Sequence, residues 1–313
     1  MKVLIVGSGG REHAIAWKVA QSPKVDKIYC APGNAGIEEY AECVNIGAME
    51  FDKLVAFAKE KEIDLTVIGM DDPLVGGVVD AFEAEGLRVF GPRKYAAILE
   101  GSKAFSKDLM KKYNSPTAAY ENFTDPQEAL AYLETAKFPI VLKADGLALG
   151  KGVLICNTLE EAKDGVKEIM EDKKFGSAGN TMVIEEFMTG REVSVLTYVD
   201  GKTIKPMTSA QDHKRAKDGD QGLNTGGMGT FSPSPFYTEE VDAFKEKEGY
   251  YVFHAGTAKK DGQIVTNGGR VLGVVAKGDD LKQARANAYK AIDLVEFDNK
   301  YYRHDIGKAI DEA

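Results

Sequence analysis

The sequence predicts a multidomain protein in which an α/β domain with a parallel sheet is followed by smaller α+β domains. The 313 residues are enough for two or three domains, each with its own core. Strand-like and helix-like segments alternate over the first hundred residues, which is typical of a parallel α/β sheet. Residues 117–187 give a mixed pattern of the size of a small α+β domain.

The N-terminal domain is expected to span 1–101 and to place ligands at the carboxyl ends of its strands, as open α/β sheets do. The strands are predicted at 2–6, 27–31, 65–68 and 88–90. The helices are predicted at 11–20, 51–60 and 75–85, with loops at 32–36 and 69–73.

The remainder divides into a helical connection at 102–120, a small α+β domain at 121–187, a segment at 188–247 and a C-terminal α+β domain at 248–313. In 121–187 we predict strands at 140–143, 153–157 and 182–186 and helices at about 126–136 and 159–171. Further on we predict strands at 193–199 and 205–207 and a long polar loop at 211–229. The last domain has predicted strands at 250–255, 263–267 and 270–276, a helix at 279–295 and a charged tail.

Composition and charge exclude several classes of protein. Apolar residues are 43% and charged residues 28%, so the chain is neither disordered nor fibrous. The net charge of −9 argues against non-specific binding to nucleic acid or to an anionic membrane, and no apolar run approaches the ~18 residues of a membrane span. Three scattered cysteines and the absence of a signal peptide predict a reduced, cytoplasmic protein.

The first glycine cluster, Gly7-Ser8-Gly9-Gly10, follows a strand and opens a helix, where backbone N–H groups hold an anion well. It is not a dinucleotide fingerprint, because Glu12 takes the place of the third glycine and the second strand lacks a ribose-binding acid. The loop Pro32-Gly33-Asn34-Ala35-Gly36 would add donors beside it. A purely structural turn is the alternative for both segments.

The strongest local signal is the segment 143–153, which places Lys143 at a strand end and Lys151 on a glycine-rich flap. Such a flap can close over the phosphates of ATP while the strand lysine meets their charge. It is not a Walker A loop, because Gly152 stands where the magnesium-binding Ser or Thr belongs. An ordinary hairpin is the alternative.

Two further segments carry polar groups. Glu185-Glu186-Phe187 could face an adenine edge and Glu192 a ribose, although paired glutamates at strand ends are more often merely solvated. In the long loop, Asp212 could pair with an ammonium group, and Lys214 or Arg215 with a carboxylate or phosphate. For His213 a hydrogen-bonded structural role is the alternative to a catalytic base.

Together these segments resemble the phosphoribosylamine–glycine ligase (glycinamide ribonucleotide synthetase) family of ATP-grasp enzymes. The matching stretches are 6–13, 32–36, 143–153, 211–215, 224–229, 254–257 and 268–274. The resemblance implies that ATP phosphorylates the glycine carboxylate and that the amine of 5-phosphoribosylamine then displaces phosphate, in de novo purine biosynthesis. It also implies an ATP-grasp lid at 121–187 and a partial ATP-grasp core at 188–247.

The resemblance implies a role for particular residues. Lys143, Lys151, Asp212 and Asn224 would be catalytic. ATP would be bound by Lys103, Lys143, Lys151, Glu185, Glu186, Phe187 and Glu192. The other substrates would be bound by Gly9, Gly10, Asn34, Gly36, Asp71, Asp212, Lys214, Thr225 and Gly226. Asp71 is a departure from the family, which usually has Gly-Pro-Glu where this chain has Gly69-Met70-Asp71.

The large departure is an absence between about 244 and 249, where the family carries on the order of a hundred more residues, the size of a small domain. These include a Glu-x-Asn metal pair, and no such pattern stands in this segment. The family uses Mg²⁺ with ATP. Because the Glu-x-Asn pair is missing, we identify no metal ligand in this chain and expect its activity to be impaired. The family is monomeric, but the deletion is expected to leave an exposed edge through which the chain could oligomerise.

Two other functions stay open at this point. The chain could bind ATP or a phosphoribosyl ligand without turnover, or it could be another ATP-grasp carboxylate–amine ligase or a purine-pathway carboxylase. Magnesium-dependent phosphate release that requires both glycine and phosphoribosylamine separates the ligase from a binding module. A nicotinamide dehydrogenase is disfavoured by Glu12.

Overall fold

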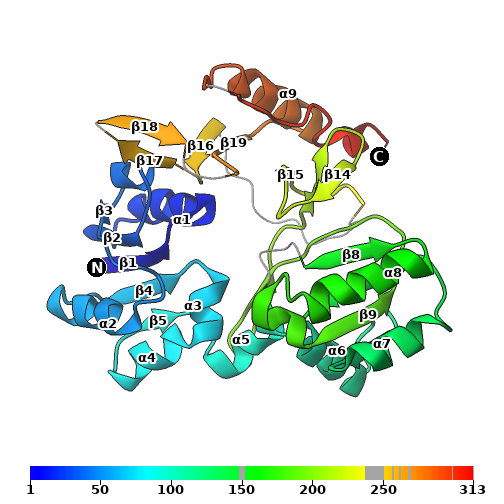
Figure 1. Ribbon diagram of the computed structural model, residues 1–313. Helices are drawn as coiled ribbons and strands as arrows, with labels where there is room; N and C mark the ends of the chain where they lie inside the picture. The colour runs from blue at the N-terminus through cyan, green and yellow to red at the C-terminus, as the bar shows by residue number, and fades with distance from the viewer. Residues whose placement is uncertain are drawn as a thin grey trace. The chain divides into compact units, whose positions relative to one another are not determined.

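The chain forms two compact units, each described here by itself. The computed structural model describes residues 1–147, 152–236, 250–255, 257–260, 262–266, 269–297 and 299–312. One unit is Met1–Thr189 with His254–Val271, and the other is Gly190–Phe253 with Leu272–Ala313 (Figure 1). Lys151 and the junction at 244–249 lie outside the described residues.

The first unit begins with a five-stranded parallel sheet, as predicted, in the order β3-β2-β1-β4-β5. Its strands are β1 (Lys2–Gly7), β2 (Lys27–Pro32), β3 (Glu42–Cys43), β4 (Leu65–Ile68) and β5 (Val89–Phe90). Its helices are α1 (Gly10–Ala20), α2 (Phe51–Glu60), α3 (Asp71–Gly76) and α4 (Val78–Ala84), with a 3₁₀ turn at Ile37–Glu39.

Helices cover both faces of this sheet, which is why the central strand β1 is apolar at successive positions. Val3 and Ile5 pack with Ala16 of α1, whereas Leu4 and Val6 pack on the side of α2 and α4 (Figure 1). The strand order reverses between β1 and β4, so the loops after these two strands meet at a switch point where such sheets bind ligands.

The helix predicted at 75–85 is wrong at its start. Two helices, α3 and α4, replace it, because Gly77 adopts φ +102° and ends the first of them. Asp71, which we placed in a loop, begins α3.

A four-stranded antiparallel sheet follows, in the order β6-β9-β7-β8. Its strands are β6 (Tyr120–Phe123), β7 (Ile140–Ala144), β8 (Val153–Cys156) and β9 (Met182–Glu186). The helices α7 (Pro126–Leu133) and α8 (Leu159–Val166), green in Figure 1, lie beside this sheet. They supply apolar side chains to its core. The predicted helix 159–171 is shorter than expected because a π turn at Lys167–Glu171 interrupts it. Before the sheet come α5 (Lys94–Gly101) and α6 (Lys103–Lys112).

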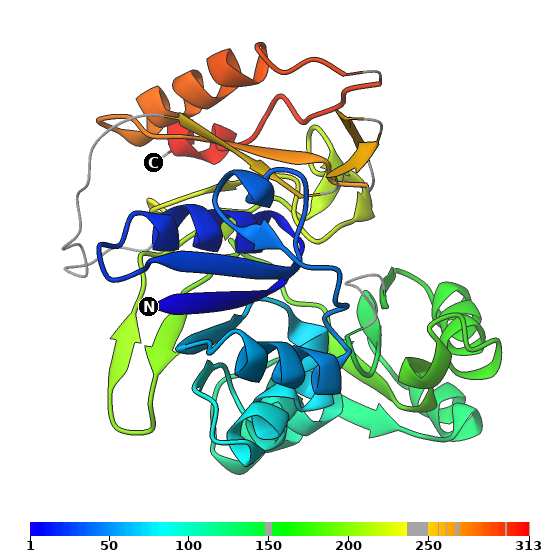
Figure 2. The ribbon, with the colours of Figure 1, turned by 90° about the vertical axis from the view of Figure 1, so that its left-hand side faces the viewer.

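The second unit contains short two-stranded pairings, among them the hairpin of β10 (Thr197–Val199) and β11 (Ile204–Pro206) seen in Figure 2. The long loop predicted at 211–229 is wrong as a loop. It holds β12 (Gln211–Asp212), β13 (Arg215–Lys217) and β14 (Gln221–Asn224), and β12 pairs with β15 (Thr230–Phe231). The turn between β13 and β14 forms because Gly219 and Asp220 adopt positive φ angles of 68° and 52°.

The C-terminal part adds β16 (Tyr250–His254), β19 (Leu272–Ala276) and α9 (Leu281–Ile292). We missed the strand β17 (Thr257–Lys260), which pairs with β18 (Gln263–Thr266). The charged tail is not solvated throughout: Arg303 is 1% exposed, and a 3₁₀ turn covers Lys308–Glu312. In the described residues, no helix is both long and apolar enough to cross a membrane.

Candidate active site

The start of α6 is fixed to the loop that follows β7. Asp145 accepts hydrogen bonds from the Ser102 hydroxyl and from the Ala104 N–H, each at 3.0 Å. Ser102 is also the N-cap of α6, since its hydroxyl accepts a bond from the Phe105 N–H. These contacts place Lys103, the first residue of α6, beside the base of the flap, where its Nζ donates to the Gly146 carbonyl at 2.5 Å.

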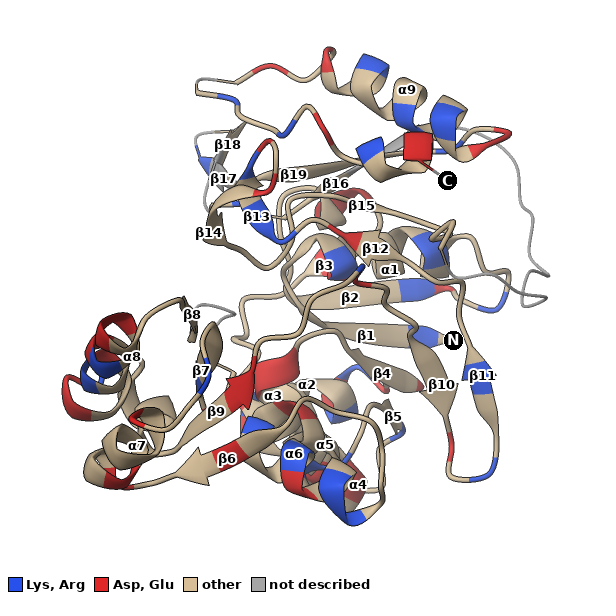
Figure 3. Ribbon diagram, turned by 90° about the vertical axis from the view of Figure 1, so that its right-hand side faces the viewer, with Lys and Arg blue, Asp and Glu red and all other residues tan. Residues whose placement is uncertain are grey.

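A buried carboxylate lies near the end of β9, an inner strand of the antiparallel sheet. Glu185 of β9 forms ion pairs with Lys143 of β7 through Oε1 and with Lys107 of α6 through Oε2, the latter at 2.5 Å. The side chain of Glu185 is 7% exposed and that of Lys143 26%. Figure 3 shows the acidic end of β9 with basic residues on β7 and α6.

These residues make a basic site at the end of the sheet. Burial lowers the pKa of Lys103, and the nearby Lys143 charge lowers it further, while Asp145 opposes both effects. Three lysines, Lys103, Lys107 and Lys143, stand against two carboxylates, Glu185 and Asp145, so one positive charge is in excess. Such a cluster can bind an anion such as a phosphate.

The other residues predicted to bind adenosine are placed differently. Glu186 accepts a hydrogen bond from the Ala119 N–H through its side chain and donates its own N–H to the Ala119 carbonyl, so these groups are engaged within the sheet. Phe187 is 38% exposed. Glu192 belongs to the second unit, where its carboxylate lies 3.4 Å from Lys214 Nζ.

The residues predicted for the phosphoribosyl end lie after β1 and β2. Gly9 and Gly10 form the start of α1. The Asn34 amide donates to the Ser8 and His254 carbonyls, at 2.7 and 2.9 Å, and its oxygen accepts from the Gly36 N–H. The Asn34 side chain therefore joins the glycine cluster to the segment at His254.

Glu12 explains why the glycine cluster is not a dinucleotide site. Its carboxylate accepts the Gly9 N–H and fills the switch point. A Cβ added at Gly69 would stand 2.3 Å from Glu12 Oε1 and one at Gly7 2.6 Å from Glu12 Cγ, so only glycine fits at either position. Burial raises the pKa of Glu12, against hydrogen bonds and the Arg11 charge, which lower it. Asp71 lies at this end too, 3.5 Å from Arg11 Nη1.

In the second unit, Asp212 and Lys214 form a close pair. Lys214 Nζ lies 2.7 Å from Asp212 Oδ2, and this contact raises the pKa of the lysine. The other oxygen, Asp212 Oδ1, is buried and accepts no hydrogen bond from the described residues. It is an acceptor that a bound ammonium group would satisfy.

The glycine-rich end of this segment is held by Lys214 as well. The N–H and hydroxyl of Thr225 both donate to the Lys214 carbonyl, at 2.7 and 2.9 Å. Asn224 lies opposite Arg215 in the β13–β14 hairpin, and Gly226 follows Thr225 directly. Five residues were predicted to line the glycine end. Asp212 ends β12 and Asn224 ends β14, while Lys214, Thr225 and Gly226 lie next to the ends of the β13–β14 hairpin.

His213 has the structural role that we held as the alternative. Its Nε2 accepts the Gly307 N–H at 3.2 Å, so its Nδ1 carries the proton and donates to the Gly229 carbonyl at 3.2 Å. With both nitrogens engaged, the ring is not free to act as a base.

Sequence reasoning missed several buried polar residues. Lys107 is one: it lies four positions after Lys103 and so on the same helical face, a spacing that is visible in the sequence. His13 accepts the His254 N–H at 2.8 Å, and Arg303 binds the β13–β14 hairpin. The latter two contacts join distant segments and leave no local signal.

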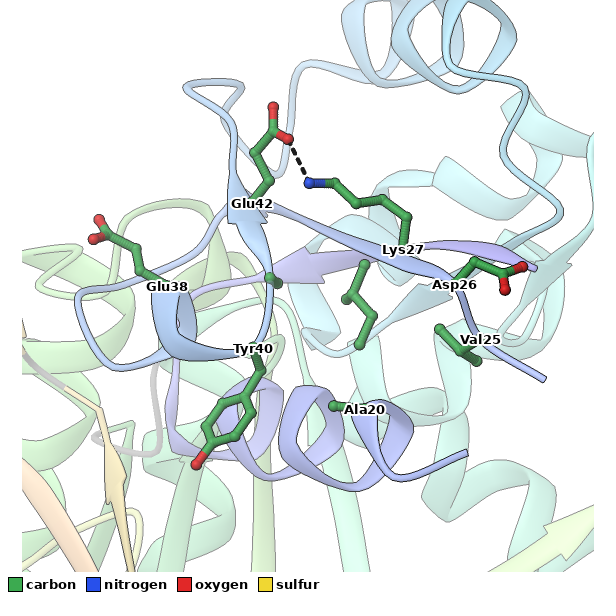
Figure 4. A pocket seen from close by; sticks show the side chains of 9 residues that line it. Ala20, Val25, Asp26, Lys27, Glu38, Tyr40 and Glu42 are labelled. Carbon is green, nitrogen blue, oxygen red and sulfur yellow. Dashed lines mark ion pairs between the residues drawn. The ribbon is translucent and has the colours of Figure 1, made fainter. Parts of the chain in front are cut away.

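A hollow of about 470 Å³ lies elsewhere, between the start of β2 and the segment before β3 (Figure 4). Lys27 and Glu42 form an ion pair at its rim, and Tyr40 lines it. These residues are at the amino ends of their strands, opposite the end where parallel sheets bind substrates. We therefore assign it no part in the reaction.

Among the described residues, no three His, Cys, Asp or Glu side chains are grouped as a metal site. We therefore assign no magnesium ligand among the described residues.

Known proteins resemble this chain along its length. Three domains of phosphoribosylglycinamide synthetase match it: the N domain at 1–100, the ATP-grasp (A) domain at 101–250 and the C domain at 236–309. Phosphoribosylamine–glycine ligase of Haemophilus influenzae is 39% identical over 419 aligned positions, covering 98% of each chain. The ligase of Halalkalibacterium halodurans is 40% identical over 419 positions, covering 100% of this chain and 98% of its own.

A solved structure agrees. Phosphoribosylamine–glycine ligase of Thermotoga maritima superposes with a TM-score of 0.82 at 28% identity, covering 97% of this chain and 100% of its own. The sequence alignments are longer than the chain's 313 residues, so the curated relatives contain positions that this chain lacks. The ATP-grasp and C-domain matches overlap at 236–250, the region where the shortening was predicted. By sequence and by fold, the chain belongs to the phosphoribosylamine–glycine ligase family of ATP-grasp enzymes.

Proposed function

We propose that this chain is an ATP-dependent ligase that joins glycine to 5-phosphoribosylamine, giving glycinamide ribonucleotide, ADP and phosphate in purine biosynthesis. The observation that carries the proposal is the cluster of Lys103, Lys143 and Glu185, a basic site within a fold whose relatives are such ligases. Its lysines can offset part of the negative charge of a nucleoside triphosphate.

The first chemical step makes the carboxylate reactive. A glycine carboxylate oxygen attacks the γ-phosphorus of ATP, the bond to the β-phosphate oxygen breaks, and glycyl phosphate and ADP result. We assign Lys103, Lys143 and Lys151 to the ATP phosphates, where their charge offsets the charge that develops during transfer. Lys151 lies outside the described residues.

The second step forms the amide. The amine nitrogen of phosphoribosylamine attacks the carbonyl carbon, phosphate leaves, and the nitrogen loses a proton. We assign Asp212 to the glycine ammonium group, because its Oδ1 is buried without a donor among the described residues. Lys214, Asn224, Thr225 and Gly226 would hold the carboxylate and the acyl phosphate.

The remaining assignments rest on the resemblance. Glu185, Glu186, Phe187 and Glu192 would hold adenosine, and Gly9, Gly10, Asn34, Gly36 and Asp71 the phosphoribosyl end. The domain division at 101, 120, 187 and 247 and a cytoplasmic location are part of the same proposal. The three cysteines are free thiols, and burial raises the pKa of Cys156 to about 11, so it resists oxidation.

Magnesium is a requirement of the family, but the described residues offer it no ligand cluster. We propose that activity is impaired. The exposed strands β10 and β11 support the idea of association with a second copy, since Val199 is 66% and Ile204 72% exposed. Sedimentation would show a monomer if that idea is wrong.

The experiment is a phosphate-release assay with the full chain, ATP and magnesium, in which glycine and phosphoribosylamine are omitted in turn. The ligase predicts release only when both are present, and isotope-labelled glycine in the product. Nucleotide binding without such release would favour a binding module.

A further inference from the structure

The carboxylate of Glu185 has two cations, but these are held very differently. Lys107 Nζ lies 2.5 Å from Glu185 Oε2 and also donates to the Thr117 hydroxyl at 2.8 Å and the Ala118 carbonyl at 3.4 Å. An ammonium group has three N–H donors, and two of these make hydrogen bonds here. The contact with Glu185 is an ion pair without hydrogen-bond geometry, since Oε2 accepts no hydrogen bond from the described residues. With its side chain only 11% exposed, Lys107 is fixed in place.

Lys143 is held less firmly. Within the described part of the chain its ammonium group has one partner, Glu185 Oε1, and its side chain is 26% exposed. Lys143 is the penultimate residue of β7, the strand that leads into the glycine-rich flap. The nucleotide phosphates are proposed to bind at this flap. Lys143 can therefore leave Glu185 for a phosphate oxygen at the cost of a single contact.

That exchange would be costly if Lys143 were the only cation of Glu185. A buried carboxylate left without its cation is strongly destabilising, which would keep the lysine on the carboxylate. Lys107 removes this obstacle, because its charge stays on the other oxygen when Lys143 moves.

We propose that Lys107 is a positioning residue for the nucleotide site: it is the permanent counter-ion of Glu185 and so frees Lys143 to bind a nucleotide phosphate. The inference rests on the proposed function, because it takes the nucleotide to be the ligand of Lys143. Lys107 itself does not touch the nucleotide.

The test compares ADP with adenosine, which share a base and ribose but differ in phosphate. Affinities are measured by calorimetry on the full-length protein, and the readout is the ratio of the adenosine Kd to the ADP Kd. Loss of packing or of adenine contacts alters both affinities together, whereas a trapped Lys143 weakens ADP alone. The ratio is therefore insensitive to a merely structural role.

In Lys107→Met the ratio is expected to fall at least tenfold, because Glu185 then retains Lys143. Lys107→Arg keeps the cation and should stay within threefold of the unchanged protein. The double variant Lys107→Met/Glu185→Gln removes the charge that traps Lys143 and should recover most of the ratio. Lys111→Met, on the same helix but outside this cluster, is the matched control.

The outcomes separate the two ideas. An unchanged ratio in Lys107→Met overturns the inference and leaves the proposed function standing. A reduced ratio that the double variant fails to recover also overturns it, since Glu185 would then not be the trap. Absence of ADP and adenosine binding in the unchanged protein overturns the proposed nucleotide site and the inference with it.

Discussion

Arg303 connects the end of the chain to the strands that carry the predicted glycine site, and replacing it with methionine tests that connection. Its guanidinium donates to both oxygens of Asp305 at 2.8 Å, to Asp220 at 2.9 Å and to the Arg215 carbonyl at 3.0 Å. Asp305 in turn accepts the Gly219 N–H at 2.7 Å. The variant would remove the four bonds at once and keep most of the side-chain volume.

The magnitude follows from the burial of each partner. Arg303 is 1% and the Asp305 side chain 20% exposed, and removing one partner of a buried ion pair costs about 3–5 kcal/mol. The side chain of Asp220 is 72% exposed, so its loss adds about 0–1 kcal/mol. We expect a loss of about 3–5 kcal/mol in the free energy of opening the β13–β14 hairpin.

Hydrogen–deuterium exchange of peptides within 211–229, with mass spectrometry, measures that opening directly. Arg93→Met is the matched control: its pair with Glu83 is exposed, so the change should cost less than about 1 kcal/mol. A loss below about 1 kcal/mol at the hairpin of the Arg303 variant would refute the reasoning.

The same pair has a defined pH dependence. Hydrogen bonds from Arg303 hold the pKa of Asp305 well below its usual range. A depressed carboxyl pKa stabilises the fold at pH values above the unfolded pKa of about 3.9, and this stabilisation is lost as the pH falls through the folded value. Hairpin opening in the unchanged protein should therefore become easier below about pH 4, and the Arg303→Met variant should lack this component.

Three further predictions concern other sites. Burial lowers the pKa of His13. A histidine whose folded pKa is lowered stabilises the fold above its unfolded pKa of about 6.5, and this stabilisation is lost on acidification. We therefore expect the Tm to drop between about pH 7 and 5, and to drop less in His13→Asn. Gly69→Ala would set a methyl group 2.3 Å from the buried Glu12 carboxylate oxygen. It should lower the free energy of unfolding, measured by denaturant titration, by about 1–3 kcal/mol. Gly10→Ala, where the nearest neighbour among the described residues outside its own helix would be 3.7 Å away, should leave that free energy nearly unchanged. Asp212→Asn should raise the KM for glycine about 10–100-fold with little change in that for ATP, unlike Asp200→Asn on the β10–β11 turn; equal effects on both substrates would contradict the assignment of Asp212.

Much of the first unit could be predicted from local pattern. The apolar run of β1 and its alternation with helices indicate a parallel sheet buried on both faces, and the structure confirms it. The glycine cluster and Glu12 excluded a dinucleotide fingerprint, and Glu12 does fill the switch point. These features depend on residues close together in the chain.

Errors arose where a local signal has two interpretations. Gly77 in a helical pattern can be tolerated or can end the helix, and its left-handed conformation decides for the second. The glycines in 211–229 predict a loop, but Gly219 and Gly222 belong to the β13–β14 hairpin. Whether such a segment is a loop or a hairpin depends on pairing between strands, which the periodicity of the sequence does not show.

The sequence by itself determined the family, the order of the elements, and the residue types of the site: lysines before and on a glycine-rich flap, carboxylates at a strand end, and an Asp-x-Lys pair. Only the tertiary structure decided which of these meet. It placed Lys107 and Lys143 on the two oxygens of Glu185, and it joined Arg303 to Arg215 across 88 positions. The physical reason is that local periodicity encodes which face of an element is buried, whereas ion pairs of this kind form only after separate elements have packed and water has been excluded.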